Sequence, residues 1–244
     1  MSRSLLLGAA ALAFAVAPAT ASVEYAYDDG VANIVLGPPL SFAQFARTDM
    51  IWGNYFPVTD GNDIITQISL MTGRFAAGSR DIRITIYDVP DATFNPFALT
   101  APVYSQTVNV GESGQSTFFD FPITPTQVSG GFFVAAVLEE VVIGTSTTTS
   151  DRPARLDPDG APFAGNSWLI YSPEYSETNL GGNIGFATAM NNPQQVPIFG
   201  VWGIRATAVP SPGSSVLLLS AIGLAAMRRR NYTRRSSGGS ESSI

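Results

Sequence analysis

A strict alternation of apolar and polar side chains constrains the fold of this chain more than any other feature of its sequence. In residues 81–90, DIRITIYDVP, three isoleucines fall on one face of an extended chain. The residues between them fall on the opposite face: Arg83, Thr85 and Tyr87. A period of two is typical of a β-strand with one face buried and the other in solvent. The segment therefore predicts a half-buried strand.

Similar short segments, rich in β-branched and aromatic residues, recur along the chain between turns that contain Gly and Pro. They span residues 63–75, 102–110, 116–123, 130–143, 166–172 and 196–209. Segment 130–143 is also compatible with a buried helix, but its initial glycines and its β-branched residues favour a central strand. About nine or ten strands and no internal repeat predict an all-β fold, a single antiparallel β-sandwich of jelly-roll-like type, over residues 22–209.

The N-terminus has the order of features that marks a secretory signal peptide. Arg3 precedes an apolar run over residues 5–16, and Ala19 and Ala21 form an A-x-A cleavage site. We therefore predict that residues 1–21 are a signal peptide and that the mature chain begins at Ser22. The alternative is a buried N-terminal helix.

The C-terminus carries a second export feature. Pro210 and Pro212 precede a charge-free apolar run over residues 216–227, and three arginines follow it: Arg228, Arg229 and Arg230. The run is shorter than the about 20 residues of a standard membrane-spanning helix. Arginines behind such a segment favour the cytoplasmic side. A short transmembrane helix that serves as a sorting tail is therefore expected, with a plain tail anchor or a C-terminal core helix as the alternatives.

Residues 209–230, VPSPGSSVLLLSAIGLAAMRRR, resemble the PEP-CTERM sorting tail of exported bacterial proteins. The resemblance implies that segment 210–230 is recognised by a membrane-embedded exosortase, which processes the protein and releases it or attaches it at the cell surface. The chain departs from the family pattern at Ser211, where the family has Glu, and in the polar extension 231–244, predicted to be disordered.

The composition excludes several kinds of chemistry. The chain has no Cys and no His, and all 13 of its basic residues are Arg. Disulfides, thiol nucleophiles, Ser-His-Asp sites and the usual zinc ligands are therefore excluded. Residues 22–209 contain 7 Arg and 18 acidic residues, a net charge of −11, which disfavours nucleic acid as a partner. The chemistry that remains possible is acid–base catalysis by carboxylates and the binding of metals with oxygen ligands, such as calcium.

Acidic residues in turns are the candidates for calcium. They are Asp60, Asp63, Asp151, Asp157 and Asp159. Asp157 and Asp159 form the candidate metal site, because jelly-roll domains often hold a structural calcium between loops; solvated turn acids are the alternative. The step Asp28-Asp29-Gly30 is typical of a tight turn.

Catalysis would require a pair of carboxylates. Glu139 and Glu140 are adjacent, so in a strand they point to opposite faces, whereas Glu174 and Glu177 share a loop and could approach each other. Aromatic residues could instead stack on a sugar, with core packing as the alternative. The aromatic candidates are Trp52, Tyr55, Phe56, Trp168, Tyr171, Tyr175 and Phe186.

The sequence thus predicts an exported cell-surface or extracellular-matrix protein that is not an enzyme. Its expected partners are the membrane and an exosortase-type sorting enzyme, and no cofactor is expected apart from the calcium considered above. The alternative function is a jelly-roll carbohydrate-binding module whose ligand is an extracellular polysaccharide.

Overall fold

The computed structural model describes residues 21–38, 48–90, 93–146, 148–159, 166–189 and 200–211. Ala19, Pro212 and the three arginines Arg228, Arg229 and Arg230 lie outside these ranges, as does the tail 231–244. Ala21 and Pro210 lie inside them. Within the described ranges, no helix combines the length and the hydropathy needed to cross a membrane.

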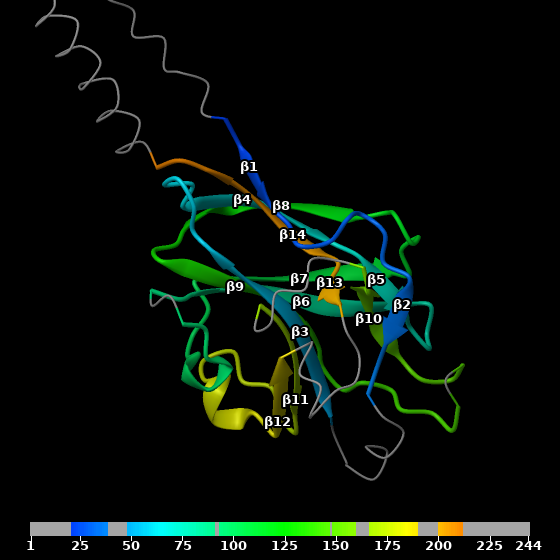
Figure 1. The fold of residues 1–244 in the computed structure, drawn as a ribbon. Coiled ribbons are helices and arrows are strands. Elements are labelled where there is room, and N and C mark those ends of the chain that lie inside the picture. Colours follow the sequence, from blue (N-terminus) through cyan, green and yellow to red (C-terminus); the bar gives the residue numbers. More distant parts are fainter. Residues whose placement is uncertain are drawn as a thin grey trace, which may run out of the picture.

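The described body is all-β, and every strand pair in it is antiparallel, which confirms the predicted class. A four-stranded sheet has the order β1 (Val23–Tyr25), β14 (Ile204–Val209), β4 (Ile64–Leu70) and β8 (Phe119–Gln127). A six-stranded sheet has the order β12 (Phe186–Ala189), β11 (Ser167–Ser172), β3 (Asp49–Pro57), β9 (Gly131–Leu138), β6 (Ser79–Asp88) and β7 (Tyr104–Gly111). Figure 1 shows these two sheets as stacked layers.

A third, small sheet forms where the chain crosses between the two layers. Its strands are β2 (Ile34–Leu36), β5 (Thr72–Arg74), β10 (Arg152–Asp157) and β13 (Val201–Trp202). We call it the corner sheet. In Figure 1, β2, β5 and β10 lie at the right-hand end, away from the start of β1 and the end of β14. Arg155 of β10 is buried and donates to the carbonyl oxygens of Thr72, Ala32 and Ser113, so it fastens the loops at this end.

The main core lies between the two large sheets and is built by alternation within the strands. Ile82, Ile84 and Ile86 of β6 enter it, as the sequence predicts, and β9 contributes every second residue from Phe132 to Leu138. The strand interpretation of segment 130–143 is thereby confirmed for Gly131–Leu138, and the helix alternative is wrong; residues 139–143 lie beyond the strand. Each fully buried side chain of this size contributes about 1.5–3 kcal/mol through the hydrophobic effect.

A second core covers the outer face of the six-stranded sheet, and it corrects the half-buried prediction for β6. Thr85 and Tyr87 were expected in solvent but are buried, with exposed fractions of 0% and 1%. The segments that carry the short 3-10 helices η2 (Pro96–Ala98) and η3 (Gly181–Asn183) contribute Leu99, Tyr175 and Leu180 to this second core. These segments therefore bury one end of the sheet face and leave the other end open.

Strand β3 was not among the predicted strands, although it is central to the larger sheet. It pairs with β11 on one side and with β9 on the other. Gly53 and Asn54 interrupt its apolar pattern, and both are explained by tertiary contacts. A Cβ at Gly53 would lie 2.4 Å from the Val134 carbonyl oxygen. Asn54 is fully buried and donates to the carbonyl oxygens of Trp202 and Ile204.

Candidate functional site

An open cavity of about 460 Å³ lies on the outer face of the six-stranded sheet, at the end that the second core leaves uncovered. We call it the sheet cavity. Its lining residues come from β6, β7 and β9 and the residue after β9: Ser79, Arg80, Asp81, Ile82, Arg83, Thr107, Asn109, Val137 and Glu139. The site is thus a patch of sheet surface with polar walls, held by three paired strands.

The strand register explains why these side chains meet. Asp81 is opposite Asn109, and Arg83 is opposite Thr107 on one neighbouring strand and Val137 on the other. Side chains opposite each other in antiparallel strands lie about 4.5–5.5 Å apart at Cβ and point to the same face. The alternation that sends the isoleucines of β6 into the core therefore sends Asp81 and Arg83 into the sheet cavity.

Arg83 joins two carboxylates that are far apart in the sequence. Its Nη2 lies 3.1 Å from Glu139 Oε1, and its Nη1 lies 3.0 Å from Glu177 Oε2. The guanidinium carbon also lies 5.9 Å from the centre of the Tyr175 ring. Burial lowers the pKa of Arg83, but the hydrogen bond with Glu139 and the charges of Glu177 and Glu139 outweigh burial and raise it above its usual value. The guanidinium therefore stays charged.

The carboxylates that share a cation are thus Glu139 and Glu177. Glu139 follows the last residue of β9, and Glu140 has a positive φ of 52°, so the two neighbours do not continue the strand as expected. Glu174 is exposed, and its backbone N–H donates to Ser172 Oγ. Sequence reasoning named Glu139 and Glu177 separately, but no local signal links them to each other or to Arg83.

Arg80, at the edge of the cavity, forms an ion pair and hydrogen bonds with other segments of the protein. Its Nη1 lies 2.9 Å from Asp151 Oδ2, and its Nη2 donates to the carbonyl oxygens of Glu139 and Glu140. The Asp151 side chain is fully buried and also accepts from the backbone N–H groups of Ala76 and Val142. Asp151, one of the acids considered for calcium, therefore fastens three segments of the chain together.

Asp81 and Asn109 form the polar wall of the cavity nearest the sheet edge. Asn109 Nδ2 donates to Asp81 Oδ1 over 2.7 Å. Both residues are exposed, as is Thr107 beside them. Asp81 Oδ2, Asn109 Oδ1 and the Thr107 hydroxyl therefore face solvent and retain capacity for further hydrogen bonds.

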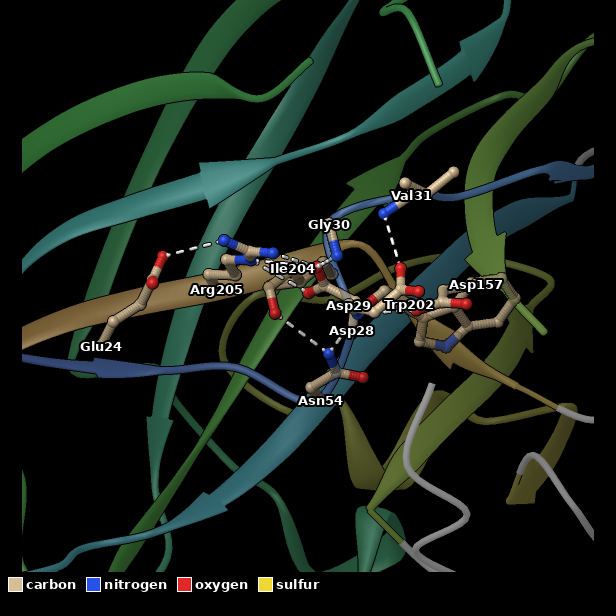
Figure 2. A network of polar contacts seen from close by, with 10 residues as sticks. All are labelled: Glu24, Asp28, Asp29, Gly30, Val31, Asn54, Asp157, Trp202, Ile204 and Arg205. Atoms are coloured by element: carbon tan, nitrogen blue, oxygen red, sulfur yellow. Dashed lines mark hydrogen bonds and ion pairs between the residues drawn. The ribbon is translucent and has the colours of Figure 1, made fainter. Parts of the chain in front are cut away.

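Asp157 and Asp159, the predicted calcium ligands, lie near the corner sheet and not in the sheet cavity. Asp157 is 1% exposed; its Oδ2 accepts from the Asp29 N–H and its Oδ1 from the Asp159 N–H, over 2.8 and 2.9 Å. Asp159 is exposed. Figure 2 shows Asp157 beside the Asp28-Asp29-Gly30 turn. No group of three or more acidic residues suited to a metal occurs among the described residues, and calcium binding stays a prediction.

The Asp28-Asp29-Gly30 step is a turn, as predicted: Asp28 Oδ1 accepts from the Gly30 N–H, and Gly30 has a φ of +96°. The sequence did not predict that Asp28 also pairs with Arg205 of β14 (Figure 2). Arg205 reaches Glu24 of β1 as well, and its guanidinium carbon lies 4.3 Å from the centre of the Phe118 ring. This network fastens the first residues of the body to its last strand.

The aromatic candidates are mostly packing residues. Trp52 and Phe56 are buried in the main core, and Tyr55 and Tyr175 are buried in the second core. Trp168 is half-buried on the same side as Ile170, and its ring meets Phe94 edge-on at 5.5 Å. Tyr171 belongs to the main core, whereas Phe186 is 37% exposed on the edge strand β12. None of these aromatic residues lines the sheet cavity.

No protein-family model and no curated protein matches the chain. Among solved structures, the chain is similar to the clostridial cysteine protease Cwp84 after propeptide cleavage, with 12% identity and a TM-score of 0.48 over 78% of this chain. It is also similar to the cysteine protease and lectin-like domains of Cwp84, a surface layer associated protein of Clostridium difficile, with 13% identity and a TM-score of 0.41 over 67% of this chain. The chain spans 40% and 32% of the length of those two structures. The chain contains no cysteine.

Proposed function

We propose that this chain is an exported cell-surface or matrix protein whose jelly-roll body binds a polysaccharide in the sheet cavity without cleaving it. The jelly-roll assignment is supported by the strand order. Eight strands of the two large sheets can be numbered from one to eight in chain order. One sheet then has the order 1-8-3-6 (β1, β14, β4, β8), and the other has the order 2-7-4-5 (β3, β9, β6, β7). This order is produced by two Greek-key foldings of one long hairpin.

The observation that carries the proposal is the chemistry of the cavity wall. Asp81, Asn109 and Thr107 lie on the same side of the sheet and retain hydrogen-bonding capacity, and Val137, which is 1% exposed, lies at the floor of the cavity. A sugar ring has the matching surface, because its hydroxyl groups donate and accept along its edge and its C–H groups form apolar faces. Ligand sites commonly combine an apolar floor with a few polar groups that fix orientation.

The positions of the termini support display at a surface. Val23 pairs with Ala208, so both ends of the body lie at one pole, and Asp63 Oδ1 accepts from the Ser211 N–H where the chain leaves the body. The start of β9 lies at this same pole, because Val128 bonds to Asp63 and Val58 bonds to Gly130. Glu139 follows the other end of β9 and lies at the opposite pole. A body attached by segment 210–230 would therefore hold the cavity away from the membrane.

The arrangement of the two glutamates favours binding over hydrolysis. Glu139 and Glu177 both accept hydrogen bonds from Arg83. A glycosidase needs one of its two carboxyls protonated, so that it can donate to the leaving oxygen. Two carboxylates that share one guanidinium serve instead to hold Arg83 and the 173–185 segment against the sheet.

A glycan array probed with the full chain tests the proposal. We expect specific retention of a polysaccharide class, at least a tenfold loss of affinity in Asn109→Ala, and no hydrolysis of the retained glycan. Asp120→Asn is the matched control, because Asp120 is exposed on β8 of the other sheet and bonds to Ser69. Binding to no glycan, or binding that Asn109→Ala leaves unchanged in a folded protein, would refute this function.

A further inference from the structure

We infer that the sheet cavity selects sugars with a free amino group, so that its polysaccharide is a cationic, amino-sugar polymer and not an acidic or neutral one. This inference rests on the proposed function and names the ligand class of the same site. It follows from an inventory of the hydrogen-bond donors and acceptors that the cavity still offers.

The cationic groups of the cavity are already engaged. The two terminal nitrogens of Arg83 bond to Glu177 and Glu139, and those of Arg80 bond to Asp151 and to two carbonyl oxygens. Recognition of a sugar carboxylate or sulfate by arginine uses the paired N–H groups of the guanidinium. Each of these terminal nitrogens donates an N–H to a protein oxygen, and the carboxylates of Glu139, Glu177 and Asp151 compensate the two guanidinium charges, so neither arginine offers an acidic sugar an uncompensated cation.

Among the groups that remain, the charged one is an acceptor, the carboxylate of Asp81. Asp81 is exposed, and its described hydrogen bond is to the neutral amide of Asn109, not to a cation. Asn109 Oδ1 lies beside it, and Thr107 Oγ1 is exposed on the same strand. An ammonium group presents three donors and no acceptor, and a bond between an ammonium and a carboxylate is about twice as strong as a bond between neutral groups. An amino group on a sugar therefore matches Asp81 and Asn109 better than a hydroxyl or an acetamido group.

The charge of the whole body acts in the same direction. Residues 22–209 carry a net charge of −11 by sequence, and all 7 of their cations are arginines. Such a body concentrates polycations near its surface and repels polyanions. The long-range attraction and the contact at Asp81 thus favour the same class of polymer, and salt should weaken both.

Titration calorimetry with the full chain and four oligosaccharides of equal length tests this inference. The four are oligomers of glucosamine, N-acetylglucosamine, glucose and galacturonate. We expect the glucosamine oligomer to bind at least tenfold more tightly than the other three, with an affinity that falls as salt is added. Asp81→Asn should abolish this preference and retain weak binding to all neutral oligomers, whereas the matched charge change Asp120→Asn should leave the preference intact.

The outcomes separate this inference from the proposed function. Equal affinity for the glucosamine and N-acetylglucosamine oligomers, both weakened by Asn109→Ala, would overturn the amino-sugar inference and leave glycan binding in place. A preference that persists in a folded Asp81→Asn variant would also overturn it, because the selectivity would then arise elsewhere. If neither these oligomers nor any glycan on the array binds, both proposals fail.

Discussion

Asp28 and Arg205 are 177 positions apart in the sequence and form an ion pair in which the Asp28 side chain is fully buried. Arg205 Nε lies 3.0 Å from Oδ1 and 3.2 Å from Oδ2 of the carboxylate. The hydrogen bond to Asp28 raises the pKa of Arg205 and outweighs the opposing effect of burial. The pair joins the turn that follows β1 to β14, so the two ends of the body are held together by charge as well as by strand pairing.

Loss of this pair should destabilise the body strongly. We expect Asp28→Asn to lower the free energy of unfolding by about 3 kcal/mol, because it leaves a partly buried guanidinium without its main counter-charge. Glu24→Gln is the matched control, since the Glu24 side chain is 51% exposed and its bond to Arg205 should contribute less than about 1 kcal/mol. Urea unfolding of residues 22–209 measures both effects, and similar values for the two variants would contradict the assignment.

Asn54 should be the amide to which stability is most sensitive. Asn54→Ala removes the donor shared by the carbonyl oxygens of Trp202 and Ile204 and the acceptor for Ser167 Oγ. Because these buried groups are left without partners, the free energy of unfolding should fall by about 3 kcal/mol. Asn33→Ala, at an exposed position, should change the unfolding free energy by no more than about 0.5 kcal/mol. Thermal unfolding followed by circular dichroism would show whether the two asparagines differ in this way.

Gly53 should not tolerate a side chain. Its missing Cβ would lie 2.4 Å from the Val134 carbonyl oxygen and 2.5 Å from the Phe133 ring, so Gly53→Ala forces two central strands apart. We expect Gly53→Ala to lower the free energy of unfolding by at least about 2 kcal/mol. A Cβ at Gly111 would lie 3.4 Å from its nearest neighbour, and Gly111→Ala should have a smaller effect. Equal melting temperatures for the two variants would contradict the close approach of β3 and β9.

The protein should lose stability in alkaline solution. Burial and the neighbouring Tyr55 raise the pKa of Tyr27 to about 12, and burial also raises the pKa of Tyr171 and of Tyr175. Above the usual tyrosine pKa of about 10, the unfolded chain releases protons that the folded chain keeps, so stability falls as the pH rises from about 10 towards 12. Urea midpoints measured across this range should fall less steeply in Tyr27→Phe than in the unmodified chain.

Removal of calcium by chelation distinguishes a metal-binding role of Asp157 from a role as a hydrogen-bond acceptor for the backbone. Because its carboxylate oxygens already accept from the backbone N–H groups of Asp29 and Asp159, we expect EDTA to leave the melting temperature unchanged. Asp157→Ala should lower the unfolding free energy by about 2 kcal/mol with or without calcium, because two N–H groups lose their acceptor. A melting temperature that falls on chelation and recovers with calcium would instead support the predicted metal site.

Local patterns predicted strands with a uniform pattern along their length, alternating in β6 and continuously apolar in β9. β6 and β9 are examples, because the isoleucines of β6 and the apolar run of β9 encode their contacts without reference to the rest of the chain. β3 was not predicted, because Gly53 and Asn54 interrupt its apolar pattern and their partners are distant in the sequence. Gly53 leaves room for the Phe133 ring, and Asn54 donates to the carbonyl oxygens of Trp202 and Ile204. These partners are between 80 and 150 positions away in the sequence, so no local pattern indicates them.

The sequence by itself determined the all-β class, the direction in which alternating side chains face, and the excess of acidic residues, because each depends on residue type and short-range order. It also placed Glu139 and Glu177 among the candidates. Only the tertiary structure decided that Arg83 would bring these two glutamates together, that Asp151 and Asp157 would bind backbone N–H groups, and that a cavity would open between β6, β7 and β9. These outcomes depend on which strands become neighbours, and strand pairing is fixed by the packing of the whole sandwich.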